Sequence, residues 1–283
     1  MVLSLPDVTL CAVTSINHEL TVQAIDACLT QCSFADVFMI ATQPVKADFR
    51  VEIIPPFAGH EYAPIVCRTL AKHTSSAFNL LIQYDGYIIE PLAWTDRFLE
   101  YDYIGAQWPW RPEGRRVGNS GFCLRSKKLF DVLATMPLPP AGQFVDDQFI
   151  CDAKRTFLEQ THKINIAPEA IADRFAYERH KPEQPTFGFH GIFNFWRHKD
   201  DADMLGIPAL LDNYYFGTQA YAEVLFHYFA ARKFAVLNCW YRPLRERLNP
   251  PELRTHLLGI MNEPAFIDEL LACGERLTET YPT

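Results

Sequence analysis

The chain has 283 residues, of which 49% are hydrophobic and 21% charged, so it can bury a large core and does not have the composition of a disordered protein. Its formal net charge is -8 and it has no basic run, which argues against a nucleic-acid backbone as partner but not against a nucleotide. No apolar run reaches the roughly 18 residues of a bilayer span, and the first six residues lack the charged region of a signal peptide, so we expect a cytoplasmic protein without a membrane span.

The first 90 residues alternate between strand-like and helix-like segments. Runs of β-branched and apolar residues predict strands, and apolar residues at helical spacing predict the helices between them. The expected strands are 8–13, 36–41, 51–56 and 79–84, and the expected helices are 21–32 and 63–74. Units of this kind wind into a parallel sheet with helices on its faces, so the predicted fold class is α/β.

The second half of the chain has a different composition. Residues 102–126 carry four glycines, two tryptophans and four arginines, and long irregular loops of this kind are usually functional. Beyond residue 200 the apolar spacing is helical. We therefore expect a sheet domain over 1–200 and a C-terminal helical extension over 201–283, which packs on the sheet domain or forms a homodimer.

Asp85 directly follows the strand-like run "NLLIQY", which begins at Asn79. Ligands of open α/β sheets collect at the carboxyl ends of the strands, so this carboxylate is a candidate for a binding site. The dipeptide Asp85-Gly86 is also a common hairpin signal, and the segment could be a plain β-hairpin with no ligand. The local sequence leaves both interpretations open.

Four features follow one another in a definite order: Asp85 at a strand end, "GNSGF" from Gly118, the acid pair Asp146-Asp147 and "FGFHG" around His190. In this order they resemble the GT-A glycosyltransferases, and most closely a poorly characterised family of bacterial and fungal glycosyltransferases. The motifs of that family stand here as "QYDG" at 83–86, "DYIGAQW" at 102–108 and "GNSGFCLR" at 118–125. The resemblance covers roughly Val8 to Trp196.

The resemblance implies a GT-A fold, which is a mixed sheet of Rossmann type flanked by helices. It implies transfer of a hexose from a nucleotide diphosphate sugar, with UDP the expected nucleotide, to a hydroxyl of a glycan acceptor, with inversion and in polysaccharide biosynthesis. Gln83 stands where the DxD-type metal motif has its first acid. Because of this departure, a non-catalytic carbohydrate- or nucleotide-binding protein on the same fold is the alternative.

The resemblance also implies a metal site formed by Asp85 and His190. Asp85 takes the last position of the DxD-type motif, where a divalent cation would bridge it to the diphosphate. His190 corresponds to the histidine that completes this site, and imidazole favours Mn²⁺ over Mg²⁺. With Gln83 in place of one acid we expect weaker metal affinity, and a metal-free mechanism stays open. A histidine in an aromatic strand is also commonly a core residue.

Asp146 and Asp147 open a predicted helix. The resemblance implies that both are catalytic residues: Asp147 stands in the place of the base that takes the proton of the acceptor hydroxyl, and Asp146 stands in the place of the glutamate of the x-E-D motif. Because a helix N-terminus favours the ionised carboxylate and lowers its basicity, we expect Asp147 to act by its position more than by a raised pKa. Acids at this position also cap helices, and capping is the alternative.

Further residues are expected around the donor and the acceptor. Trp108 and Trp110 could stack on a sugar face or seal the edge of the core. Arg68 could approach the ribose or diphosphate, or face solvent from its helix. The donor-site residues that the resemblance implies are Val13, Thr14 and Ser15 for the nucleobase and Gln83, Asp85, Gly118, Asn119, Ser120 and Gly121 for the diphosphate and the sugar.

Overall fold

The structure is a computed structural model that describes residues 2–280. The chain forms two compact units that divide between His190 and Gly191. The N-terminal unit holds the strands, and the described part of the C-terminal unit is helical. The expected transferase domain ending at residue 200, with a helical extension that packs on it or forms a dimer, stays a prediction.

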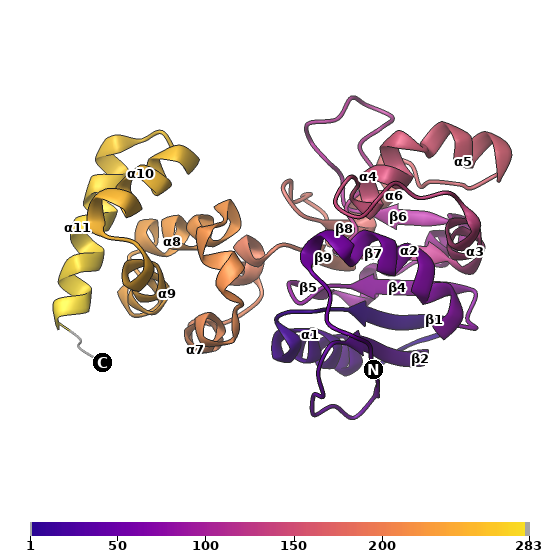
Figure 1. The fold of residues 1–283 in the computed structure, drawn as a ribbon, viewed down its shortest axis with the longest axis horizontal. Helices are drawn as coiled ribbons and strands as arrows, with labels where there is room; N and C mark the ends of the chain where they lie inside the picture. The colour runs from indigo at the N-terminus through magenta and orange to yellow at the C-terminus, as the bar shows by residue number, and fades with distance from the viewer. Residues whose placement is uncertain (1, 281–283) are drawn as a thin grey trace. The chain divides into compact units, whose positions relative to one another are not determined.

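The N-terminal unit is built on a six-stranded sheet with the order β3-β2-β1-β4-β7-β6. Its strands are β1 (Leu3–Val13), β2 (Cys32–Ala41), β3 (Arg50–Ile53), β4 (Phe78–Ile82), β6 (Tyr103–Gly105) and β7 (Phe122–Ser126). The first four are parallel, whereas β7 runs antiparallel to both β4 and β6. Figure 1 shows β2, β1, β4, β7 and β6 side by side in this order.

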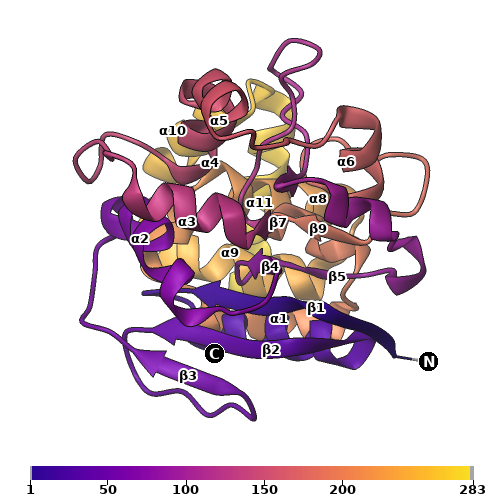
Figure 2. The same ribbon diagram turned by 90° about the vertical axis from the view of Figure 1, so that its right-hand side faces the viewer.

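Helices cover both faces of this sheet. They are α1 (His18–Gln31), α2 (Tyr62–His73), α3 (Lys127–Thr135), α4 (Asp146–Gln148), α5 (Arg155–Thr161) and α6 (Glu169–Phe175). The crossovers through α1 and α2 run in opposite directions along the sheet, and since such connections are right-handed, the two helices lie on opposite faces. α3 packs beside α2 (Figure 2). The predicted fold class, a mixed α/β sheet flanked by helices, is confirmed.

A second, smaller sheet continues from the end of β4. It contains β5 (Gly86–Ile88), β9 (Gly188–His190) and β8 (Ala176–Tyr177), in the order β5-β9-β8. β5 follows β4 after a turn at Tyr84 and Asp85, but it pairs antiparallel with β9 and not with β4. The hairpin interpretation of Asp85-Gly86 is therefore wrong, because the strands on either side of the turn belong to different sheets.

The central strands are buried along most of their length, because helices cover the sheet on both sides. Leu80, Leu81 and Ile82 of β4 are fully buried, as are Leu10, Cys11 and Ala12 of β1. Because both faces of these strands are buried, their sequences are continuous apolar runs.

One predicted helix is interrupted: the segment that opens with Asp146 has a π-helical turn, Phe149–Ala153, between α4 and α5.

The described helices of the C-terminal unit are α7 (Asp201–Gly206), α8 (Gln219–Ala230), α9 (Phe234–Arg247), α10 (Pro250–Ile260) and α11 (Pro264–Thr280), with short 3-10 turns before α7 and between α7 and α8. Its core is aromatic: Tyr221, Trp240 and Tyr241 are fully buried, and the Tyr221 hydroxyl donates to the Trp240 carbonyl at 2.6 Å. No helix within residues 2–280 combines the length and the apolar character that crossing a bilayer requires.

Candidate active site

The carboxyl edge of the parallel strands is where most of the predicted site residues meet. β1 and β4 are neighbours and end at Val13 and Ile82. Because β7 is antiparallel to β4, its start lies opposite Ile82, and the loop before it, Gly118–Gly121, reaches the same edge. The amide of Gln83 donates to the carbonyl of Gly121 at 2.8 Å. This bond joins the end of the Asp85 strand to the glycine-rich loop.

Asp85 faces His190. In the small sheet Gly86 pairs with His190, which sets the neighbouring carboxylate against the imidazole. Nε2 of His190 lies 3.2 Å from Oδ1 of Asp85, and Nδ1 lies 3.2 Å from Oε1 of Glu178. All three side chains are largely buried. The structure thus brings Asp85 and His190 together and adds Glu178, which is not predicted from the sequence because it belongs to none of the motifs described above.

The two carboxylates change the acid-base behaviour of His190. Burial by itself lowers the pKa of the ring, because the imidazolium loses its hydration. Attraction to Asp85 and hydrogen bonds to Asp85 and Glu178 outweigh burial and raise the pKa to about 10. At neutral pH the ring therefore carries a positive charge between two acids.

The loop Gly118–Gly121 lies directly against His190. Asn119 has a left-handed backbone with φ 45°, and its Nδ2 lies 3.2 Å from Nδ1 of His190. The Asn119 Oδ1 accepts the amide of Gly121 at 3.2 Å, which closes the loop on itself. A Cβ atom on Gly121 would collide with the imidazole ring. Glycine is required at this position because the backbone approaches the ring so closely.

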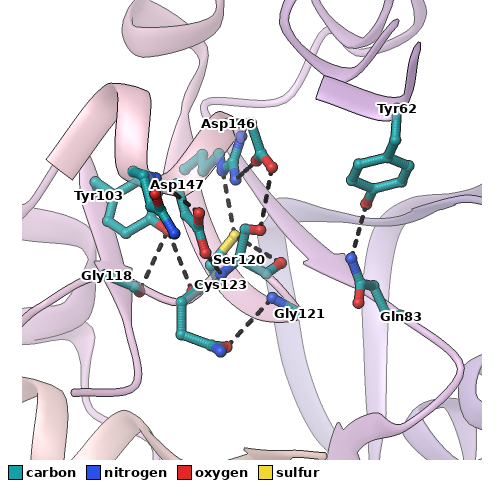
Figure 3. Close-up of polar contacts among 12 residues, drawn as sticks. Tyr62, Gln83, Tyr103, Gly118, Ser120, Gly121, Cys123, Asp146 and Asp147 are labelled. Carbon is teal, nitrogen blue, oxygen red and sulfur yellow. Dashed lines mark hydrogen bonds and ion pairs between the residues drawn. The ribbon is translucent and has the colours of Figure 1, made fainter. Parts of the chain in front are cut away.

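Asp146 is the buried partner of Arg125. Its Oδ2 lies 2.5 Å from Nη2 of Arg125, and the two side chains are 1% and 0% exposed. Its Oδ1 accepts the hydroxyl of Ser120 at 3.3 Å (Figure 3). Nε of Arg125 donates to the sulfur of Cys123 at 3.2 Å. Both oxygens of Asp146 are thus engaged inside the protein, and one of them holds the glycine-rich loop.

Asp147 is only half-buried. Its Oδ2 accepts the amide of Ser120 at 3.3 Å and its Oδ1 accepts the amide of Gln148 at 2.7 Å. Burial and the neighbouring charge of Asp146 raise the pKa of Asp147 to about 6, although the two amides act in the other direction. The expectation that the helix terminus would lower the basicity of this carboxylate is therefore wrong, because burial and like charge outweigh the helix terminus.

Neither acid caps the helix in the usual way. α4 has only three residues, and its N-cap is Val145, whose side chain makes no capping bond. A capping carboxylate accepts an amide two or three residues ahead, whereas Asp147 accepts the amide of the next residue, Gln148. The two adjacent aspartates instead take different places, one in the core and one against the loop.

The region after β1 contains the predicted nucleobase residues. Val13 is buried and offers only its backbone, and the amide of Thr14 donates to Ile40 of β2 at 2.9 Å. The hydroxyl of Thr42 donates to the carbonyl of Ser15 at 3.4 Å. His18, which the sequence analysis missed, lies beside them with Nε2 3.1 Å from the Thr42 hydroxyl. His18 opens α1, just after the end of β1, and this position could have marked it in the sequence as a candidate for the same region.

The guanidinium of Arg68 is bound by the end of α3. Its nitrogens donate to the carbonyls of Leu133, Ala134 and Met136 at 3.1, 2.5 and 2.6 Å. These carbonyls close the C-terminal end of α3, where a cation is favourable. The structure therefore gives Arg68 a role in holding α2 to α3.

The two loop tryptophans have different surroundings. Trp108 is 5% exposed and packs on Gly118, where a Cβ atom would collide with the indole. Trp110 is 62% exposed, and its ring is stacked on that of Trp108 with the centroids 6.5 Å apart. Trp108 therefore seals the edge of the core, and Trp110 offers an open aromatic face beside the loop.

Comparison with known proteins finds one matching family. The profile described as "Protein of unknown function (DUF5672)" matches residues 68–190, which is less than half of the chain. This segment includes the Asp85 strand, the glycine-rich loop, the acid pair and His190. No curated protein matches the sequence.

Several solved structures are similar in fold. TarS residues 1–349 from S. aureus has 12% identity and a TM-score of 0.43, and the match covers 97% of this chain and 92% of TarS. The same TarS fragment in complex with UDP has 13% identity and a TM-score of 0.41, with 97% and 92% covered. The mannosyltransferase PcManGT from Pyrobaculum calidifontis, in complex with GDP-Man and Mn²⁺, has 10% identity and a TM-score of 0.41, with 99% and 84% covered.

Proposed function

We propose that the protein is a glycosyltransferase that moves a hexose from a nucleotide diphosphate sugar, with UDP the expected nucleotide, to a hydroxyl of a glycan acceptor. One observation carries the proposal. The loop Gly118–Gly121 contacts the Asp85–His190 pair through Asn119 and the half-buried Asp147 through Ser120. A group suited to a diphosphate and a group suited to an acceptor hydroxyl therefore flank the same short loop.

The residues present fit a divalent cation. Oδ1 of Asp85 and Nε2 of His190 are 3.2 Å apart, so one cation could take both as ligands, and imidazole and carboxylate are ligand types that suit Mn²⁺. Within the described residues no cluster of three or more His, Cys, Asp or Glu is arranged to hold a metal. Two protein ligands suit a cation that takes its other ligands from a diphosphate and water. Asp85 and His190 would hold it, and it would offset the charge on the diphosphate leaving group.

Asp147 is suited to the acceptor side. A general base works best when its pKa lies near the working pH, and Asp147 has a pKa of about 6, well above that of an ordinary aspartate. At neutral pH it is ionised and still more basic than an exposed carboxylate. Direct proton removal by one carboxylate is what a single displacement with inversion requires. Asp146, engaged with Arg125 and Ser120, keeps the loop and its neighbour in place.

The other predicted residues complete the donor site. Thr14 and Ser15 follow β1 and would contact the nucleobase, and the backbone of Gly118–Gly121 would allow close approach of the donor sugar. Gln83 does not act as a metal ligand in this proposal, because its amide donates to the Tyr62 hydroxyl at 3.3 Å. Trp110 provides a surface for stacking on a sugar.

The test is binding followed by turnover. Ligand at a hundred times its dissociation constant stabilises the native state by ~2.7 kcal/mol, so UDP with Mn²⁺ should raise the melting temperature clearly, and EDTA should remove most of the shift. Release of nucleotide diphosphate from a panel of nucleotide sugars then measures activity. A shift without any release of nucleotide, whatever the sugar and acceptor, would favour the non-catalytic binding protein. No shift with any nucleotide would reject both the glycosyltransferase and a nucleotide-binding protein.

A further inference from the structure

Glu178 is the member of the buried cluster to which the proposed function gives no role. It follows β8 directly, and β8 runs parallel to β9 with Tyr177 paired to Phe189. The next residues along these two strands are Glu178 and His190. The register of the small sheet therefore sets the carboxylate beside the imidazole, so this contact does not depend on a flexible surface side chain.

The two nitrogens of His190 face different partners. Nε2 lies on the side of Asp85, and Nδ1 lies on the side of Glu178, each at 3.2 Å. Only Nε2 can therefore share a cation with Asp85. For that it must present a lone pair, which in a neutral imidazole requires the proton to sit on Nδ1.

Without a cation, Asp85 accepts a hydrogen bond from Nε2–H, and a cation that took both Asp85 and Nε2 as ligands would displace that proton. The two groups beside Nδ1 then decide where the remaining proton sits. The Glu178 carboxylate accepts a hydrogen bond, so it favours a proton on Nδ1. The Asn119 Nδ2 group, also 3.2 Å from Nδ1, donates, so it favours a bare Nδ1 with the proton on Nε2. A hydrogen bond to a carboxylate is roughly twice as strong as one between neutral groups. Glu178 should therefore prevail, so that the proton stays on Nδ1 and Nε2 presents its lone pair to the cation.

We propose that Glu178 is the positioning residue of the cation site. Its carboxylate accepts the Nδ1–H of His190, which fixes the ring orientation and directs the Nε2 lone pair to the side of Asp85. Metal-binding histidines are commonly held in this way by a carboxylate that does not touch the metal. The proposal rests on the proposed function, because it presupposes a cation at Asp85 and His190.

A purely structural role for Glu178 makes a different prediction. As a partner of a buried charged ring it would contribute to folding stability, and its loss would lower the melting temperature without metal. The affinity for Mn²⁺ would then be unaffected in a variant that stays folded. Metal affinity, measured separately from stability and from activity, therefore distinguishes positioning from simple packing.

The experiment titrates Mn²⁺ into the full chain in the presence of UDP and follows free Mn²⁺ by electron paramagnetic resonance. Glu178→Ala should weaken Mn²⁺ binding by roughly 10- to 100-fold. Glu178→Gln should weaken it less, because its amide oxygen still accepts from Nδ1–H but carries no charge. Asp102→Asn is the matched control, because the Asp102 side chain is also 13% exposed. Its carboxylate accepts the hydroxyl of Ser126, which lies at the other end of the strands, beside the start of β4. The control should keep the wild-type affinity for Mn²⁺.

The outcomes separate the two proposals. Wild-type affinity in folded Glu178→Ala overturns the positioning role and leaves the cation site standing. If Glu178→Ala does not fold, wild-type affinity in Glu178→Leu, which has no acceptor for Nδ1–H, overturns it equally. An equal loss in Asp102→Asn also overturns it, since the effect would then follow general destabilisation. If the wild-type protein binds UDP but no Mn²⁺, the cation site of the proposed function is rejected, and the proposed role of Glu178 is rejected with it.

Discussion

The carboxylate of Asp146 and the guanidinium of Arg125 form an ion pair of 2.5 Å in which both side chains are excluded from solvent. The pair links the start of α4 to β7, because Asp146 opens the helix and Arg125 belongs to the strand. A buried pair of this kind adds little net stability over an apolar pair, but removal of one partner leaves an uncompensated charge in the core.

Asp146→Asn should therefore lower the free energy of unfolding by about 3 to 5 kcal/mol. Denaturant titration followed by circular dichroism measures this. The control is Asp131→Asn, which breaks the exposed Lys127–Asp131 pair and should cost about 0.2 to 1 kcal/mol. Equal losses in the two variants would mean that the Arg125–Asp146 pair is not held in a dry environment. Removal of both charges together, in Arg125→Met with Asp146→Leu, should cost less than Asp146→Asn alone.

Asp147→Asn should leave the fold and donor binding intact and lower the transfer rate by about 10²-fold or more, because an amide cannot accept the proton of the acceptor. The measurement compares nucleotide release with the thermal shift by UDP and Mn²⁺ in the same variant. Near-wild-type turnover would remove Asp147 as the base. Asp146→Asn is not a clean activity control, because it also disturbs the core.

The raised pKa of Asp147 predicts how the free energy of unfolding depends on pH, and this can be measured without a substrate. The folded state holds this proton up to a pKa of about 6, whereas an unfolded aspartate loses it near 3.8. Between these values the folded state binds more protons, so the free energy of unfolding should fall as pH rises from about 4 to about 6, by at most ~3 kcal/mol for this group. Asp147→Asn should lack this decrease and be the more stable protein at pH 7. Parallel pH profiles for the two proteins would contradict the raised pKa.

The same group predicts how activity depends on pH. Turnover per bound donor should rise as pH increases through about 6, because only the ionised carboxylate accepts a proton. The measurement is the rate of transfer at saturating donor between pH 5 and pH 8. A rate that stays flat across this range would argue against a base with this pKa.

Gly121→Ala tests the close approach of the loop to His190. The new Cβ atom would overlap the imidazole, so the ring or the backbone must move. We expect a loss of about 1 to 3 kcal/mol in stability, as for other overpacked positions, and a clear weakening of the UDP and Mn²⁺ thermal shift. Gly59→Ala is the control, since a Cβ atom there meets open space and should change neither property. An unchanged shift in Gly121→Ala would separate the loop from the ligand site.

Replacement of Trp108 and of Trp110 should have different effects on stability, although the two rings are stacked on each other. Trp108→Ala should cost about 3 to 5 kcal/mol of stability, because the ring is buried on Gly118. Trp110→Ala should change stability by about 0.5 kcal/mol or less, because its ring is exposed. If Trp110 stacks on a sugar, its variant should also weaken binding of donor or acceptor. Thermal unfolding measures the stability of each variant, and titration with nucleotide sugar measures its binding. If both variants bind as tightly as the wild-type protein, stacking on a sugar is excluded.

Local sequence was sufficient for the strand-helix-strand opening and for Asp85 at a strand end. Apolar runs and helical spacing report burial of successive residues, and burial on both faces of a parallel sheet leaves this pattern directly in the sequence. The glycine-rich loop was also visible, because glycines mark positions where a backbone approaches something closely. What Asp85 faces was not visible, since β5 pairs with β9, which comes about 100 residues later in the chain.

The two aspartates of the acid pair show most clearly what only the tertiary structure decides. Asp146 and Asp147 are chemically identical neighbours, so no local pattern distinguishes their burial or their pKa. The fold turns one towards Arg125 in the core and the other towards the amide of Ser120. Arg68 is a similar case, because the α3 carbonyls that bind it come from a distant segment. Charge pairing and desolvation depend on contacts between residues far apart in the chain, and these contacts exist only once the sheet has assembled.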